Sequence, residues 1–146
     1  MSLMNSSSTK EYEQVSPDSP LGLGKGLVVQ EIGYDEDVDF DLREAIEAAT
    51  GTELVDEDYD DVTDAAVVWW RDDDADLTDT LVDALALLEE GGVIWVLSPK
   101  PGRPGHPDPS EIAEAAGIAG LHATSSKSVG PDWSGTRLSA RGRPKR

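Results

Sequence analysis

Residues 85–97 read Leu-Ala-Leu-Leu-Glu-Glu-Gly-Gly-Val-Ile-Trp-Val-Leu, and this stretch decides the fold. Its first half closes the helical pattern of Leu77–Glu90, in which leucines recur on one side. Gly91 can adopt a positive φ and stop the helix, and Gly92 allows a tight reversal. The run Val93–Leu97 is continuously apolar, which is typical of a strand covered on both faces. A helix that leads through two glycines into a buried strand favours an α/β sheet.

The same alternation extends to both sides of this stretch. We predict strands at Leu27–Ile32, Thr52–Val55, Ala65–Trp70, Val93–Leu97, His122–Val129 and Ser134–Ala140. We predict helices at Asp41–Thr50, Leu77–Glu90 and Pro109–Ala116. Alternating strands and helices form a parallel sheet through right-handed crossovers, whereas the last two strands form an antiparallel hairpin. The expected fold class is therefore α/β, a three-layer Rossmann-like, mostly parallel sheet with a C-terminal antiparallel hairpin.

The predicted helices carry end signals. Asp41 and Glu44 fit a capping box for the first helix, and Gly51 suits its C-terminal end. Asp108 suits the N-cap of the last helix, with Pro109 at its first position.

The 146 residues suffice for one domain with a real core. Residues 1–26 are polar and lack a hydrophobic period, so we predict that they are disordered. Residues 27–141 form the predicted domain, and residues 142–146 a basic, flexible tail. No apolar segment approaches the length of a membrane span, there is no signal-peptide pattern, and there are no cysteines. These features indicate a cytoplasmic protein without disulfides, thiolate metal sites or a membrane partner.

The net charge is −18, and the charge is unevenly spread. Residues 31–90 hold 23 acidic residues against two arginines, whereas residues 100–146 carry a net charge of +4. An acidic body repels nucleic acid and anionic lipid. The acidic surface is either simply solvated or a face that docks a basic protein partner.

The helix–Gly-Gly–strand step of residues 85–97, together with the closing hairpin, resembles the class I methyltransferase fold, in which the last strand inserts antiparallel to the rest. The segment between the second and third predicted strands is too short for a helix and a strand, so one such unit is missing. At closer range the chain resembles an actinobacterial family catalogued as domain of unknown function 3052. The segments that carry this resemblance are Gly22–Gly26, Val28–Gly33, Trp69–Arg71 and Ser98–Gly102.

Ligands of open parallel sheets bind beyond the carboxyl ends of the strands. We therefore predict that the segments after the strands converge into one cofactor or ligand site. Its candidate residues are Gly33, Tyr34, Asp56, Glu57, Arg71, Asp72, Ser98 and Lys100. The methyltransferase resemblance implies S-adenosylmethionine as the cofactor, with an acid at Asp56-Glu57 on its ribose hydroxyls.

The loop after the first strand argues against that cofactor. Active methyltransferases have several glycines there, but this chain has Gly33 alone, followed by Tyr34 and three acidic residues. Those carboxylates would oppose the carboxylate of S-adenosylmethionine. We predict weak or no binding of S-adenosylmethionine and no catalytic residue.

The acids that alternate from Asp35 to Asp41 resemble the start of a calcium loop. However, Phe40 stands where that loop needs glycine, and Ile46 stands where it needs a bidentate carboxylate. No dedicated metal site is expected.

The tail is the last motif. Arg141, Gly142, Arg143 and Pro144 resemble the core of an AT-hook, which lies in the minor groove of A·T-rich DNA. The alternatives, which the acidic body favours, are that the basic tail contacts the protein's own acidic face or stays solvated. The sequence thus leaves three hypotheses open: a non-catalytic binding or regulatory module, a small methyltransferase, and a DNA-associated accessory protein.

Overall fold

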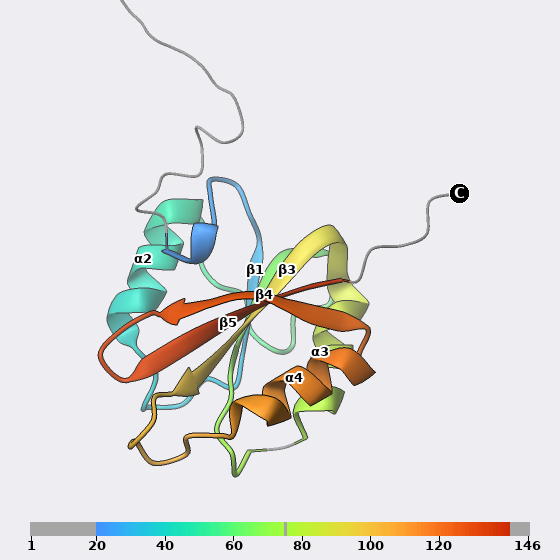
Figure 1. The fold of residues 1–146 in the computed structure, drawn as a ribbon. Coiled ribbons are helices and arrows are strands. Elements are labelled where there is room, and N and C mark those ends of the chain that lie inside the picture. Colours follow the sequence, from blue (N-terminus) through green and yellow to red (C-terminus); the bar gives the residue numbers. More distant parts are fainter. Residues whose placement is uncertain (1–19, 75, 141–146) are drawn as a thin grey trace, which may run out of the picture.

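A computed structural model describes residues 20–74 and 76–140 (Figure 1). Five strands form one sheet in the order β1-β2-β3-β5-β4. The strands are β1 (Val29–Ile32), β2 (Thr63–Trp69), β3 (Leu88–Pro99), β4 (Leu121–Ser128) and β5 (Trp133–Ala140). Strands β1, β2 and β3 are parallel, whereas β5 runs antiparallel to both β3 and β4. The predicted mixed sheet with a closing hairpin is confirmed.

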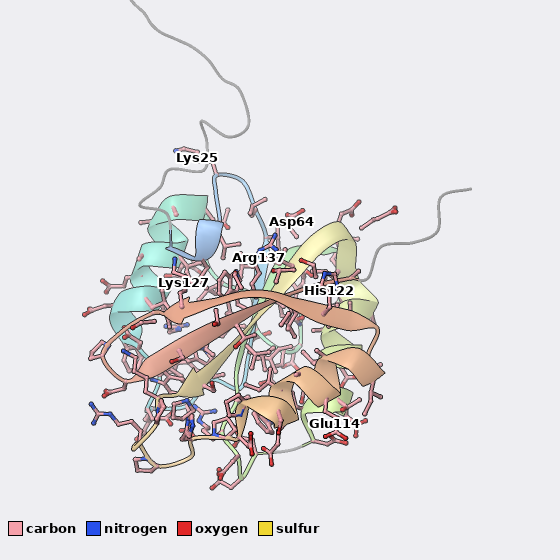
Figure 2. The ribbon with its side chains drawn as sticks, viewed as in Figure 1. Lys25, Asp64, Glu114, His122, Lys127 and Arg137 are labelled. Carbon is pink, nitrogen blue, oxygen red and sulfur yellow. The ribbon has the colours of Figure 1, made fainter. Side chains whose placement is uncertain are left out.

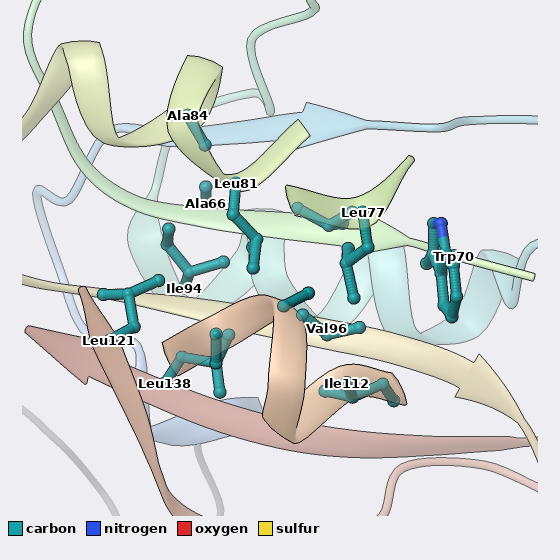
Figure 3. Packing of buried hydrophobic residues seen from close by; sticks show 13 residues of the cluster. Ala66, Trp70, Leu77, Leu81, Ala84, Ile94, Val96, Ile112, Leu121 and Leu138 are labelled. Atoms are coloured by element: carbon teal, nitrogen blue, oxygen red, sulfur yellow. The ribbon is translucent and has the colours of Figure 1, made fainter. Parts of the chain in front are cut away.

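Helices cover both faces of the sheet (Figure 1). Helix α2 (Phe40–Thr50) and the short 3₁₀ helix η1 (Pro20–Gly22) pack on one face. Helices α3 (Leu77–Leu87) and α4 (Pro109–Ile118) pack on the other. Each face buries its own apolar cluster, and Figure 3 shows the one beneath α3 and α4, where Leu81, Ile94 and Leu138 are fully enclosed. The three layers of the α/β prediction are therefore present.

Strand periodicity explains the division of the core. Even-numbered residues of β2, such as Ala66 and Val68, face α3, whereas Val67 and Trp69 face α2. All seven residues of β2 but one are buried, as expected for a central strand covered on both faces. The adjacent Trp69 and Trp70 therefore both belong to the core, on opposite faces.

The predicted strand at Thr52–Val55 is wrong. Only Val55 pairs with the sheet, through a parallel bridge to Gln30 of β1. The Val55 N–H donates to the carbonyl of Val29 at 3.0 Å, and the Val55 carbonyl accepts from Glu31 at 2.8 Å. The chain then turns at Asp56, so the pairing stops after one residue. Residues 56–62 return to β2 without a helix or a strand.

Three predicted helix ends need correction, and two end signals are confirmed. Helix α4 runs to Ile118, two residues beyond the predicted end at Ala116. Asp39, not Asp41, caps α2: its Oδ1 accepts from the N–H of Leu42 at 2.9 Å. Helix α3 ends at Leu87 rather than Glu90, because Leu88 is already extended and pairs with Thr63. The positive φ of Gly91 therefore belongs to the irregular start of β3, not to the helix end. The left-handed Gly51 and the Asp108 cap agree with the sequence patterns.

The folded region begins earlier than Leu27. The sequence predicts disorder up to Gly26, but Leu21 and Leu23 are buried against the α2 face of the sheet. The carbonyl of Leu21 also accepts from the indole N–H of Trp95 at 3.1 Å. Residues 1–19 and the basic tail 141–146 lie outside the described residues. None of the helices in the described ranges is long and apolar enough to cross a membrane.

Candidate functional site

The carboxyl ends of β1 and β2 meet at a hollow of about 290 Å³, which we call the strand-end hollow. Four of the eight predicted site residues line it: Gly33, Tyr34, Glu57 and Arg71. The other four do not line it: Asp72, Ser98 and Lys100 lie at the ends of β2 and β3, and Asp56 follows the single bridge residue Val55. The structure thus brings half of the predicted residues together.

Gly33 is required by the fold itself. Its φ is +83°, a conformation that residues with a Cβ rarely adopt. A Cβ built on Gly33 would lie 2.3 Å from the backbone oxygen of Trp69. This glycine therefore serves the close approach of two strand ends, and its presence is not evidence of a cofactor.

The two backbone polar groups of Gly33 are engaged by side chains of the chain. Its N–H donates to Oε2 of Glu57 at 2.8 Å. Its carbonyl accepts from Nη1 of Arg71 at 2.9 Å. The methyltransferase resemblance implies an acid at Asp56-Glu57 for the ribose of a cofactor, and this stays a prediction. In the structure Oε2 of Glu57 accepts from the loop after β1.

Arg71 is the centre of a charged network at the strand-end hollow. Its side chain is only 11 % exposed and bridges Asp37 and Asp74, with Nη1 3.1 Å from Oδ2 of Asp74. The same Nη1 also donates to the carbonyl of Trp69, and the guanidinium lies 5.3 Å from the ring centre of Trp133. Burial alone would lower the pKa of Arg71, but the hydrogen bonds to Asp37 and Asp74 outweigh it and raise that pKa.

The remaining predicted residues have local structural contacts. Tyr34 is half exposed and meets the Phe40 ring edge-on, with 6.1 Å between ring centres. The Asp56 carbonyl accepts from the amide of Gln30, and the Asp72 N–H donates to the carbonyl of Gly105.

Ser98 and Lys100 lie at the carboxyl end of β3, at the same edge of the sheet. Ser98 is buried and pairs with Ser134 of β5, so its place is fixed by the sheet. The Lys100 N–H donates to the carbonyl of Asp132 at 2.9 Å, which ties the end of β3 to the turn before β5. Both contacts are structural.

Sequence patterns missed the acids that partner the two arginines. Arg43 binds the buried Glu31 through two hydrogen bonds of 2.7 and 2.9 Å, and Trp69 donates to the same carboxylate. The available signal was the scarcity of cations. Arg43 and Arg71 are the only basic residues in the sequence from 31 to 90, which holds 23 acidic residues, so acidic partners were to be expected for both. Which acids they would find depends on the fold.

Two further predictions concern metal and DNA. Within the described ranges, no group of three or more histidine or acidic residues is arranged to hold a metal ion. The AT-hook-like residues Arg141, Gly142, Arg143 and Pro144 lie outside the described residues, so DNA binding stays a prediction.

Solved methyltransferases share this fold. A putative methyltransferase from Thermoplasma acidophilum has a TM-score of 0.58 and 10% identity, covering 83% of this chain and 71% of its own. The CcbJ methyltransferase from Streptomyces caelestis has a TM-score of 0.53 and 13% identity, covering 84% and 86%. At these identities the likeness shows a methyltransferase-like Rossmann fold and nothing about activity.

Sequence relatives place the chain more narrowly. The uncharacterized proteins Rv2239c of Mycobacterium tuberculosis and Mb2263c of Mycobacterium bovis are each 57% identical over 118 residues, which is 81% of this chain and 74% of theirs. The family described as "Protein of unknown function (DUF3052)" matches residues 18–142. The protein is therefore a member of the DUF3052 family, built on a methyltransferase-like fold.

Proposed function

We propose that this protein is a non-catalytic binding module that docks a positively charged protein segment. The observation that carries the proposal is a groove of about 380 Å³ between α3 and α4, the α3–α4 groove. Five acidic residues line it: Asp72, Asp74, Asp76, Glu111 and Glu114. Among the described residues that line the groove, none is basic.

Apolar residues also line the α3–α4 groove. Leu77 and Ala115 are buried and form its apolar floor, whereas Ile118 at the end of α4 is 68 % exposed. Figure 2 shows Glu114 projecting from α4 on this side of the molecule. A groove with an apolar floor and an acidic rim is complementary to a segment that carries both apolar and cationic side chains.

The strand-end hollow supports the non-catalytic part of the proposal. A cofactor carboxylate that approached the Gly33 N–H would have to displace Glu57 and would meet Asp35. Each unpaired like-charge contact costs on the order of 1 kcal/mol in a partly buried site. We therefore propose that S-adenosylmethionine binds weakly or not at all. We also propose a cytoplasmic location, in keeping with the absence of cysteine.

The test is a titration of the full chain with a labelled amphipathic Leu/Lys peptide, with a Leu/Glu peptide of the same pattern as control. We expect saturable binding of the Leu/Lys peptide only. The double variant Glu111→Gln with Glu114→Gln should weaken binding about tenfold, which corresponds to about 1.4 kcal/mol.

The matched control is Asp58→Asn with Asp60→Asn, which removes two exposed charges outside the groove. It should change the affinity less than twofold at 0.15 M salt, where distant charges are screened. Equal weakening by both double variants would show diffuse attraction to the acidic body and would contradict a docking groove.

A further inference from the structure

A second hollow lies on the other flank of α3, between that helix and β1. This β1–α3 hollow has a volume of about 190 Å³. Gln30 and Ile32 of β1, Glu57, and Thr80, Asp83 and Leu87 of α3 line it. It exists because residues 56–62 return to β2 without a helix, so no helix of that segment covers β1 on this face.

Gln30 is the unusual residue of this hollow. It is 3 % exposed, on the face of β1 that looks toward α3. Its Nε2 donates to the carbonyl of Asp56 at 3.2 Å, which fixes the orientation of the amide. Its Oε1 is buried and has no hydrogen-bond partner among the described residues. Buried acceptors in native proteins are nearly always satisfied, so an unpartnered one calls for a donor from outside the chain.

The other polar groups of the hollow are acceptors as well. Thr80 donates its hydroxyl hydrogen to the carbonyl of Asp76, which leaves only lone pairs on its oxygen. Asp83 forms no ion pair with any described residue, and Glu57 uses only Oε2 for Gly33. The site therefore presents two carboxylates, one hydroxyl oxygen and one buried amide oxygen. Its ligand must supply N–H donors and positive charge.

We propose that the β1–α3 hollow binds a compact organic cation, a primary ammonium or guanidinium group. Gln30 Oε1 is its buried acceptor, and Glu57 and Asp83 are its counter-charges. The volume lies below the range of sites for drug-sized ligands, so the hollow takes a head group and not a nucleoside. The site is separate from the α3–α4 groove and does not depend on the function proposed for it.

The experiment is a titration of the full, ¹⁵N-labelled chain with methylguanidinium chloride, followed by NMR at constant ionic strength. We expect saturable shifts centred on the Gln30 side-chain amide and on Thr80. Methylurea, which is similar in shape but neutral, should bind at least tenfold more weakly. Equal affinity for methylurea, shifts centred elsewhere, or adenosine binding at Gln30 in preference to the cation would overturn the proposal.

Matched variants on α3 sharpen the test. Asp83→Asn should weaken methylguanidinium binding at least fivefold, whereas Asp79→Asn, on the same helix but outside the hollow, should change it less than twofold. Gln30→Met removes the buried acceptor and should abolish saturable binding, with urea unfolding as the check that the variant folds. Equal effects of Asp83→Asn and Asp79→Asn would refute the site.

A cationic group of this kind can come from an arginine side chain of a protein or from a free small molecule. A titration with N-acetylarginine amide, an arginine blocked at both ends, distinguishes the two. If N-acetylarginine amide binds as tightly as methylguanidinium, the natural ligand is an arginine side chain of a protein. If it does not bind whereas methylguanidinium does, the ligand is a free small molecule. Both results support the site. The variants Glu111→Gln and Glu114→Gln should leave this binding unchanged, so that failure here is distinct from failure of the α3–α4 groove.

Discussion

At the residue scale, the strand-end hollow is organised by one glycine, one glutamate and one arginine. Gly33 lets β1 approach the end of β2. Its N–H donates to Glu57, and its carbonyl accepts from Arg71. In a cofactor-binding loop those backbone groups would be turned toward the ligand. Here they close on the protein, so all three residues stabilise the fold at this edge, and Glu57 does so through Oε2 alone.

Replacing Gly33 tests the strain argument. Gly33→Ala should lower the free energy of unfolding by about 3 kcal/mol, because a positive φ and a backbone clash act together. Gly51→Ala has nearly the same φ but no atom within 4 Å of the added Cβ, so it should cost about 1 kcal/mol. Urea unfolding measures both. Equal losses would mean that the contact with Trp69 is not a constraint.

Replacing Arg71 tests the charged network. Arg71→Met should lower the free energy of unfolding by about 2 kcal/mol, because it leaves the Gly33 and Trp69 carbonyls without their charged donor. The control is Arg103→Met, since the Arg103–Asp132 pair is about half exposed on both sides and should contribute less than about 1 kcal/mol. A larger loss for Arg103→Met, measured by thermal unfolding, would refute this ranking.

At the element scale, the sequence patterns located helices α2, α3 and α4 and the five strands of the sheet in the described residues, but not the 3₁₀ helix η1. Apolar periodicity and Gly or Pro signals are local, which is why these elements were predictable. The sequence patterns failed where tertiary pairing overrides a local signal. Asp41 with Glu44 resembled a capping box, but the chain becomes helical earlier, at Phe40. Thr52–Val55 had the composition of a strand, but only Val55 reaches β1 before the chain turns.

The cap of α2 can be checked directly. Asp39→Ala should lower the free energy of unfolding by about 1 kcal/mol, because the N–H of Leu42 loses its acceptor. Asp41→Ala removes only a favourable charge in the first turn and should cost a few tenths of a kcal/mol. If urea unfolding shows the larger loss for Asp41→Ala, the helix begins where the sequence pattern placed it.

The contribution of the N-cap of helix α4 to the stability of the fold depends on pH, and the sign of that dependence follows from the pKa of Asp108. Hydrogen bonds from the backbone and the hydroxyl of Ser110 lower the pKa of Asp108 below its ordinary value. A carboxylate with a lowered pKa stabilises the fold above its unfolded pKa, and that contribution is lost as the pH falls through the folded pKa. The pKa of Asp108 from NMR titration should therefore lie below that of an aspartate in an unstructured peptide, about 3.9. An unshifted or raised pKa would contradict the cap.

At the scale of the whole molecule, the methyltransferase-like architecture followed from the order of strands and helices. The candidate site followed only in part. Sheet topology guarantees that parallel strands end at one edge, which brought Gly33 and Arg71 together. Glu57 reaches the same edge through the single parallel bridge of Val55 to β1. Neither the acidic partners of Arg71 nor the unpartnered Oε1 of Gln30 could be predicted from the sequence, because both depend on which groups the loops bring within hydrogen-bond distance.

The central claim is our proposal that, because Glu57 and Arg71 engage the Gly33 backbone at the strand-end hollow, S-adenosylmethionine binds weakly or not at all. Calorimetry of the full chain with S-adenosylmethionine and S-adenosylhomocysteine tests it most directly. Two or three like-charge contacts of about 1 kcal/mol each remove roughly one and a half to two powers of ten from a micromolar affinity, so we predict a dissociation constant of about 0.1 mM or weaker, or no detectable heat. A low-micromolar dissociation constant that Glu57→Ala abolishes would contradict the account and would make Glu57 a ribose-binding residue.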